Sequence, residues 1–370
     1  MSGRVRTALL VTQDLNRAGA QRQCVELALG LHARPGWRVE VAVLEPGGPL
    51  TSELSGHGIP IHPCPRRWRW DLSPASALAR IAGTIGAEVI HTFLFLPNFY
   101  GRLARLRHRP PLVVSSLRST GIEGWPRYAG EVLLAPLCDV IIANSDAGRD
   151  DLVRRGVSGR RVEVVRNGLT FERFDTARAD GLPPFADVRR LGMVAQMERR
   201  KDHAGLVEAL ARLRAGDPRV RLVLAGDGGL ADRVREAARR HGVFEAIDWL
   251  GTVSRPETVY ATLHLYVQAS AAEEGTSNSI LEAMASGRPV VATDIGGNRE
   301  VVADGVTGLV VPPRNPAALA AAAQALLADE GRARAYGEAG AQRVRERYGR
   351  AAMIEATLAV YEERLAARAS

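Results

Sequence analysis

Two carboxylates flank the predicted start of one helix. Glu274 precedes a helix that we expect to open near Asn278, and Glu282 lies about one turn inside it, with seven residues between the two acids. A short apolar strand ending at Ala269 leads into the loop before this helix. Free N–H groups and the positive end of the helix dipole bind anions at such a helix start. The stretch 268–302 therefore predicts a phosphate site.

The acids themselves suit neutral hydroxyl groups. On a helix, Glu282 shares one stripe with Asn278 and Ser279, and Thr276 and Ser277 complete the loop before it. Carboxylates repel phosphates, so the hydroxyls of a sugar or a ribose are their expected partners. For an isolated pair of glutamates, the alternative is a solvated helix residue and an ordinary loop acid.

The stretch 273–293 reads E-E-G-T-S-N-S-I-L-E-A-M-A-S-G-R-P-V-V-A-T. It resembles the E-x7-E signature of retaining, nucleotide-sugar-dependent glycosyltransferases of the GT-B group, family four, and the resemblance extends through most of the chain. The resemblance implies that Glu274 contacts the hydroxyls of the donor sugar and that Glu282 contacts the ribose. The small residues between the two acids are then expected to bind the donor: Thr276, Ser277, Asn278 and Ser279.

One cation stands out by its residue type. Of the 49 basic residues, 48 are arginine, and Lys201 is the single lysine. A site that needs a compact ammonium resists replacement by arginine, because the two side chains differ in shape and hydration. The resemblance places Lys201 at the position of a lysine that holds the donor diphosphate together with an arginine. Gln196 occupies the arginine position, so either Arg199 or Arg200 compensates or the leaving group is stabilised less than in relatives.

Three residues in the first half lie at or just after the ends of predicted strands. Gly19 lies at a strand-to-helix turn, and the resemblance implies a loop there, often with two glycines, next to the donor phosphate and the acceptor. Ala18 takes the place of the first glycine, and a purely structural turn is the alternative. Arg118 stands where many relatives have a histidine near the donor sugar, and it could instead bind the diphosphate or a charged acceptor. His91 ends a strand and is as consistent with a hydrogen-bonded core histidine as with a functional one. We assign catalytic roles to Lys201, Glu274 and Arg118.

Alternating apolar strands and helices predict an α/β fold of parallel sheets covered on both faces. The alternation restarts at Arg190 after a turn-rich stretch, 175–187, which we interpret as a linker. With the resemblance, this predicts the GT-B architecture, two facing Rossmann-like doubly wound domains with a cleft between them. The domains are expected at 1–178, which binds the acceptor and is completed by a C-terminal helix at 351–370, and at 186–349, which binds the donor.

The positive charge is concentrated in the first half. Residues 1–180 contain 24 arginines and 17 acids, most of the net charge of +8. Basic clusters with aromatic residues at 66–70 and 102–109 could contact an anionic membrane surface or an acidic acceptor, and a solvated basic face is the alternative. We find no nucleic-acid-binding motif and expect no nucleic-acid partner. The chain has no apolar run of about 18 residues and no signal-peptide pattern at its start, so we expect a cytoplasmic protein, open to contact with the inner face of the membrane.

Metal and cofactor motifs are sparse. Cys24, Cys64 and Cys138 are far apart without a C-x-x-C pair, and no D-x-D occurs, so we expect no metal and no cofactor beyond the nucleotide sugar. The stretch 226–231 contains G-x-G-x-x-A with Asp248 about twenty residues on, the outline of a dinucleotide fingerprint. This pattern keeps an NAD-linked enzyme or a sugar-nucleotide epimerase open as an alternative.

The predicted function is the transfer of a sugar, with retention of anomeric configuration, from a nucleoside diphosphate sugar to an acceptor hydroxyl. A UDP sugar is favoured, and the acceptor is expected in bacterial polysaccharide, glycolipid or natural-product biosynthesis. A protein that binds nucleotide sugars without catalysis is the remaining alternative, because Gln196 and Arg118 both depart from the family pattern.

Overall fold

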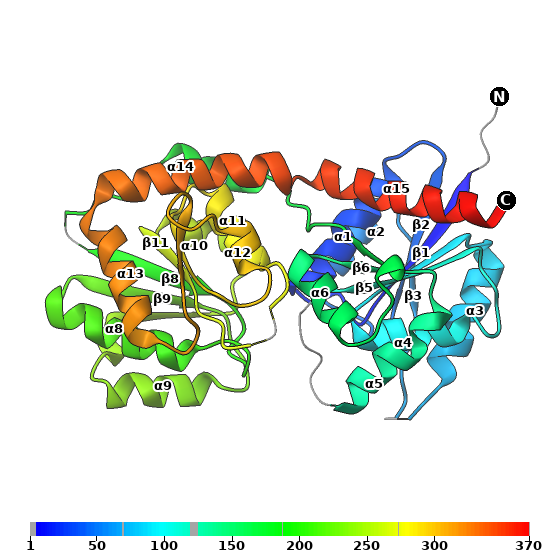
Figure 1. Cartoon of the computed structure of the whole chain (residues 1–370), viewed down its shortest axis with the longest axis horizontal. Coiled ribbons are helices and arrows are strands. Elements are labelled where there is room, and N and C mark those ends of the chain that lie inside the picture. Colours follow the sequence, from blue (N-terminus) through cyan, green and yellow to red (C-terminus); the bar gives the residue numbers. More distant parts are fainter. Residues whose placement is uncertain (1–4, 69, 119–124, 187, 273, 370) are drawn as a thin grey trace. The chain divides into compact units, whose positions relative to one another are not determined.

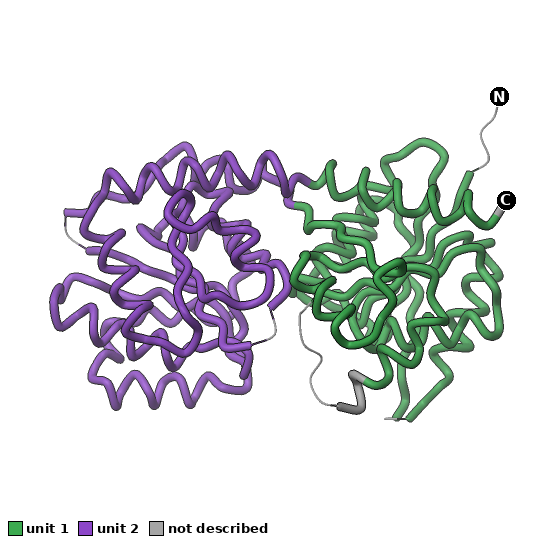
Figure 2. The backbone as a smooth tube through the Cα atoms, in the orientation of Figure 1, with its two compact units in different colours: residues 1–168, 350–370 green, residues 169–349 purple. Residues whose placement is uncertain are grey.

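The chain forms two compact units. The computed structural model describes residues 5–68, 70–118, 125–186, 188–272 and 274–369. The first unit comprises residues 1–168 and 350–370, and the second comprises residues 169–349 (Figure 2). Within the described ranges, no helix combines the length and hydropathy needed to cross a bilayer.

The first unit contains a parallel sheet with helices on its faces (Figure 1). Its strands are β1 (Arg6–Thr12), β2 (Trp37–Val43), β3 (Ile61–Pro63), β4 (Val89–Phe93), β5 (Leu112–Leu117), β6 (Val140–Ala143) and β7 (Val162–Val164). Its helices are α1 (Gly19–His32), α2 (Thr51–Gly56), α3 (Ser73–Ile85), α4 (Phe95–Ala104), α5 (Trp125–Leu134), α6 (Asp146–Arg154) and α15 (Arg350–Ala369). The described strands lie in the order β3-β2-β1-β4-β5-β6-β7, and every pair is parallel.

The C-terminal helix α15 is part of the core of the first unit. Ile354 packs against α1 so closely that a Cβ on Gly30 would lie 2.0 Å from its Cδ1 atom. The Tyr361 hydroxyl lies 2.6 Å from Nδ1 of the buried His91, whose Nε2 lies 2.7 Å from the Ser116 hydroxyl. Burial, and then the charge of Arg118, lower the pKa of His91 well below its usual value. His91 is therefore a neutral, hydrogen-bonded core residue.

The second unit repeats the architecture with six strands among its described residues. Its strands are β8 (Arg189–Val194), β9 (Val220–Ala225), β10 (Ile247–Gly251), β11 (Leu265–Gln268), β12 (Val290–Thr293) and β13 (Gly308–Val311). Its helices are α7 (Glu172–Ala179), α8 (His203–Gly216), α9 (Ala231–Arg240), α10 (Pro256–Ala261), α11 (Asn278–Ala285), α12 (Asn298–Val301), α13 (Pro316–Ala328) and α14 (Glu330–Arg347). The strand order is β10-β9-β8-β11-β12-β13, again parallel at every described pair.

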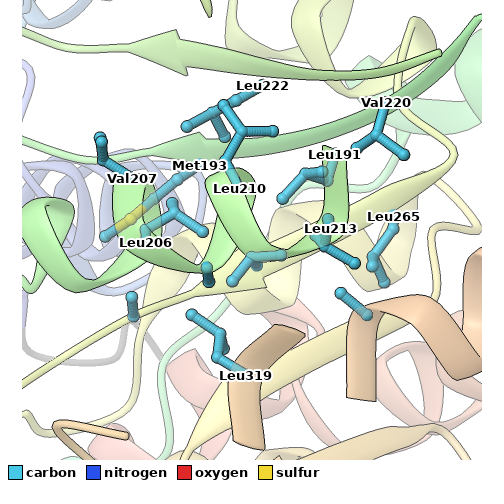
Figure 3. Close-up of a cluster of buried hydrophobic side chains, with 14 of the residues drawn as sticks. Leu191, Met193, Leu206, Val207, Leu210, Leu213, Val220, Leu222, Leu265 and Leu319 are labelled. Atoms are coloured by element: carbon cyan, nitrogen blue, oxygen red, sulfur yellow. The ribbon is translucent and has the colours of Figure 1, made fainter. Parts of the chain in front are cut away.

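An apolar core holds β8 and α8 in place. Leu206, Leu210 and Leu213 recur at helical spacing on the inner face of α8 and pack toward Leu191 and Met193 of β8 (Figure 3). The loop after β8 is therefore fixed at both of its ends by buried contacts. This loop carries Lys201.

The second unit begins earlier than the sequence predicts. The chain enters it at Leu169, and the stretch 172–179, which we expected to end the first domain and begin a linker, forms helix α7. Phe174 and Ala177 are buried against the second unit, and the ring of Phe174 lies 6.3 Å from that of Tyr260. The predicted boundary at 178 is thus wrong, because two buried residues on one helix face are too few to show as apolar periodicity.

Candidate active site

The candidate site lies where the strand order of the second sheet reverses. Strands β8 and β11 are neighbours there, and the chain leaves their carboxyl ends in opposite directions. Ligands of doubly wound sheets bind at such a switch point. The two loops are joined by their backbones: Asp202 N–H donates to Ala269 O at 3.0 Å, and Ala271 N–H donates to Arg200 O at 2.9 Å. Lys201 and Ser270 form the antiparallel bridge between these bonds.

A buried ion pair occupies this junction. The Lys201 Nζ atom donates to Glu274 Oε1 at 2.7 Å, and the two side chains are only 8% and 4% exposed. Arg200 reaches the same carboxylate oxygen at 3.6 Å. Burial lowers the pKa of Lys201, and the carboxylate of Glu274 opposes that shift. Two residues 73 positions apart thus form one charged cluster, with an ammonium held by a carboxylate.

Two helices begin beside the cluster. Asp202 caps α8, because its Oδ1 atom accepts from Gly205 N–H at 2.9 Å. The Ser277 side chain at the N-cap of α11 makes no such capping bond. Thr276 and Ser277 are buried, whereas Asn278 and Ser279 at the start of α11 are half-buried. The predicted donor-loop residues therefore surround the N-terminus of α11.

The second acid, Glu282, is held by a tyrosine that the sequence did not single out. Tyr260 of α10 is fully buried, and its hydroxyl donates to Glu282 Oε2 at 2.8 Å. Burial, followed by the charge of Glu282, raises the pKa of Tyr260 well above its usual value. The tyrosine therefore stays protonated and remains a donor. Its contact fixes the orientation of the half-buried carboxylate.

A chain of hydrogen-bonded, buried polar side chains connects β11 to β12 at the junction. The Tyr266 hydroxyl donates to Gln268 Oε1 at 2.7 Å, and Gln268 Nε2 donates to Ser270 Oγ at 3.0 Å. Ser270 N–H in turn donates to Thr293 Oγ1 at 2.9 Å. Tyr266, Gln268 and Ser270 alternate along the chain, and this period of two on an otherwise apolar strand was the signal available in the sequence.

Arg200, and not Arg199, is the arginine close to the ion pair. Gln196 and Arg199 are exposed in the loop after β8, whereas Arg200 is partly buried and also bonds Glu198 at 2.6 Å. Of the two candidates to replace the arginine missing at 196, the geometry thus brings only Arg200 to Glu274.

The glycines of the dinucleotide-like stretch pack against the Lys201 loop. Gly226 has a φ of 136°, and a Cβ there would lie 2.0 Å from the carbonyl oxygen of Ala195. Met197 N–H donates to Asp227 O at 3.0 Å, and Leu230 N–H donates to Met197 O at 3.0 Å. These glycines therefore let the loop after β9 lie directly on the loop after β8, and that packing accounts for them.

The first unit carries the remaining predicted site residues. Gly19 is exposed at the first position of α1. Arg118 follows β5, donates to Asn167 Oδ1 at 2.8 Å and lies over the Phe93 ring at 5.1 Å. Burial lowers the pKa of Arg118 to about 10, against the opposing effects of Cys24 and then Tyr361. Arg118 therefore remains a cation at neutral pH.

The described residues contain no group of three His, Cys, Asp or Glu side chains that could hold a metal ion. The charges described at the β8–β11 junction include the ammonium of Lys201, the guanidinium of Arg200 and the carboxylates of Glu274 and Glu198.

Acidification should destabilise the protein through His203, the first residue of α8. Burial, and then the charge of Lys201, lower its pKa to about 4, against about 6.5 for an unfolded histidine. Between these values the unfolded chain binds a proton that the folded chain does not, so the free energy of unfolding falls as the pH drops, by about 3 kcal/mol near pH 4. Urea unfolding at pH 7 and near pH 4 should show that His203→Gln removes this part of the decline.

The matched control is His241→Gln, at an exposed histidine of the same unit. In His241→Gln the free energy of unfolding should fall between pH 7 and about pH 4 as much as it does in the parent protein. An equal decline in the parent protein and in His203→Gln would show that His203 does not contribute.

Comparisons with known proteins identify the class. A family model described as Glycosyltransferase Family 4 matches residues 17–173, and one described as Glycosyl transferases group 1 matches residues 180–343. The D-inositol 3-phosphate glycosyltransferase of Streptomyces bingchenggensis is 31% identical over 78% of this chain and 71% of its own length. The alpha-maltose-1-phosphate synthase of Mycolicibacterium smegmatis is 33% identical over 75% of this chain and 79% of its own.

Solved structures share the fold. The Anabaena protein Alr3699/HepE, in a complex with UDP and glucose, superposes with a TM-score of 0.85 at 21% identity and covers 96% of this chain and 99% of its own. The sucrose-phosphate synthase of Thermosynechococcus elongatus gives 0.80 at 23% identity, with 98% and 100% covered. The fold is therefore the GT-B fold of glycosyltransferases, as predicted. The chain belongs to glycosyltransferase family 4, and the protein is a glycosyltransferase.

Proposed function

We propose that the protein transfers a sugar from a nucleoside diphosphate sugar to an acceptor hydroxyl, with retention of configuration and without a metal ion. The observation that carries this proposal is the buried Lys201–Glu274 pair at the β8–β11 junction, beside the start of α11. An ammonium and a helix N-terminus together suit the two phosphates of the donor. UDP sugars are favoured, because the similar Anabaena structure holds UDP and glucose.

The roles of the residues follow from where negative charge develops. When the bond to the anomeric carbon breaks, charge builds on the leaving diphosphate, so a cation placed there in advance stabilises the transition state more than the ground state. We assign this role to Lys201, supported by Arg200. Glu274 holds the ammonium and meets the hydroxyls of the donor sugar, and the small residues at the start of α11 meet the phosphates. We assign no nucleophile, and the departing phosphate itself assists attack from the same face.

The first unit is proposed to bind the acceptor, with Arg118 near the reacting groups and Gly19 in a loop next to the donor phosphate and the acceptor. The excess positive charge of residues 1–180 suits an anionic acceptor. One relative is named for D-inositol 3-phosphate, which carries a phosphate. The proposal covers acceptors from polysaccharide, glycolipid or natural-product biosynthesis that the protein would meet in the cytoplasm.

The reaction can be tested before the acceptor is known. Purified protein with UDP, GDP or ADP sugars and EDTA should hydrolyse one donor class slowly, releasing the diphosphate. Proton NMR of the first sugar released should show the anomer of the donor. Release of the opposite anomer would contradict retention, and activity that appears only on adding a divalent metal would contradict a metal-free site.

Glu282 is proposed to bind the ribose, with Tyr260 as its positioning residue. Loss of one charged hydrogen-bond partner in Glu282→Gln should weaken binding of the preferred nucleotide by about 1.5–3 kcal/mol, roughly 10- to 100-fold. Tyr260→Phe removes only the contact that orients Glu282, so it should weaken binding less, roughly three- to tenfold. Titration calorimetry measures both.

A double substitution separates positioning from general loss of stability. Tyr260→Phe should have little further effect on nucleotide binding once Glu282→Gln is present, because the two residues act through one contact. Tyr348→Phe is the matched control, since its buried hydroxyl reaches Glu300 O at 3.4 Å and not Glu282. Additive losses in the double variant would refute the positioning role, and unchanged affinity in Glu282→Gln would refute the ribose role.

A further inference from the structure

Within the described residues of the first unit, three large apolar side chains are exposed within one short turn. Trp68 is 59% exposed, Trp70 is 71% exposed, and Leu72 at the start of α3 is 52% exposed. These residues lie between β3 (Ile61–Pro63) and α3 (Ser73–Ile85). Large apolar side chains that lie close together and are exposed to solvent mark an interaction surface.

The turn is held in shape by Asp71. Its carboxylate accepts from the backbone N–H groups of Arg67 at 2.9 Å and Ser73 at 2.8 Å, and its own N–H donates to Trp68 O at 3.1 Å. The Tyr100 hydroxyl donates to the Asp71 carbonyl oxygen at 2.8 Å. The bonds from the backbone, that of Arg67 first, lower the pKa of Asp71. The indoles are therefore presented by a fixed turn.

The exposed charges described in the turn are positive. Arg66 and Arg67 are exposed, whereas the one acid, Asp71, is buried in the turn. Arg69 lies outside the described residues. Tryptophans beside arginines suit the boundary between the headgroups and chains of an anionic bilayer, where the rings bury apolar area and the cations meet lipid phosphates.

The second basic cluster of the sequence, 102–109, does not form such a surface throughout. Arg102 is fully buried and pairs with Glu131 at 2.6 Å, and Arg105 pairs with Asp139 at 2.7 Å. The expectation that this whole cluster is an exposed basic face is therefore wrong for its first member. The combination of exposed indoles and exposed arginines falls at 66–72.

The turn follows an edge strand of the first sheet, in the unit that is proposed to bind the acceptor. Strand β3 is an edge strand parallel to β2 and β1, so the turn leaves the same carboxyl edge of the sheet as the loop that carries Gly19. We propose that the turn 66–72 docks the first unit on an anionic lipid bilayer. This surface does not depend on the proposed donor chemistry, and it would bring a lipid-borne acceptor to that edge.

Vesicle co-sedimentation of the full chain tests the proposal without turnover. The parent protein should bind phosphatidylcholine vesicles that contain phosphatidylglycerol. It should not bind vesicles made only of phosphatidylcholine. Trp68→Ser with Trp70→Ser should weaken partitioning roughly tenfold or more, and Arg66→Ala with Arg67→Ala should weaken it and reduce its dependence on salt. Brominated lipid should quench tryptophan emission in the parent and much less in the double tryptophan variant.

The matched control is Val306→Ser, which removes an exposed apolar side chain, 58% exposed, from the second unit. It should partition like the parent, and thermal unfolding should show that all the variants fold. Equal partitioning of the double tryptophan variant, or no preference of the parent for anionic vesicles, would overturn the proposal. A parent that is dimeric by light scattering, with a monomeric tryptophan variant, would assign the turn to a second copy of the chain instead.

Discussion

Replacing Lys201 with alanine is expected to lower the turnover of donor hydrolysis roughly 10²- to 10³-fold, the size of loss seen when one preplaced stabiliser of transition-state charge is removed. The ammonium lies in a buried site, 2.7 Å from Glu274, where its field is screened less than in water. In the proposed role its binding to the phosphate strengthens as the diphosphate departs, so the loss should appear mainly in kcat. Released nucleoside diphosphate measures it.

The matched control is Arg199→Ala, which removes an exposed cation from the same loop and should change turnover little. Lys201→Arg tests the need for a compact ammonium and should recover only part of the activity. Because Lys201→Ala removes the ammonium that pairs with the buried Glu274, thermal unfolding must show that the variant is folded at the assay temperature. Turnover of folded Lys201→Ala within a few-fold of the parent would remove Lys201 from the catalytic role.

Glu274→Gln is expected to lower activity roughly 10- to 100-fold, through lost hydrogen bonds to the donor sugar, and to move the pH profile. In the proposed role Lys201 acts as the ammonium, so activity should fall as the pH rises through its pKa. Burial already lowers that pKa, and the carboxylate of Glu274 opposes the shift. Without the carboxylate the pKa falls further, so the alkaline limb of the kcat profile should move to lower pH.

Profiles of kcat between about pH 7 and pH 10 measure the shift. Glu208→Gln is the matched control, because that acid of α8 pairs with Arg212 and is not among the groups that shift the pKa of Lys201. Its alkaline limb should stay close to that of the parent. An unmoved limb in Glu274→Gln would mean that the ion pair does not set the protonation of Lys201 during turnover.

The sheets and long helices could be predicted from the sequence, because continuous apolar runs mark strands buried on both faces. The run A-L-L-V of β1 and the spacing of leucines in α8 are examples. Helix α7 could not be predicted in this way, since Phe174 and Ala177 are its buried residues and the rest of the helix is polar. Its place in the second unit depends on contacts with residues more than eighty positions away.

The individual residues of the candidate site could be predicted from the sequence, but the contacts between them could not. Residue type and family resemblance both pointed to Lys201, and the resemblance pointed to Glu274, but only the fold shows that a hydrogen bond joins them. Tyr260 gave no signal, because a tyrosine in a short helix is most often a core residue. The choice of Arg200 over Arg199 likewise depends on which way the loop turns after β8, and sequence spacing does not determine that.

Titration calorimetry with UDP, GDP, ADP and NADH, in the presence of EDTA, tests the central claim that the β8–β11 junction is a metal-free nucleoside diphosphate site. One diphosphate, with UDP favoured, should bind with EDTA present, and Lys201→Ala should weaken its binding while Arg199→Ala leaves it unchanged. Binding of NADH alone, or diphosphate binding that EDTA abolishes or that Lys201→Ala leaves untouched, would contradict the claim.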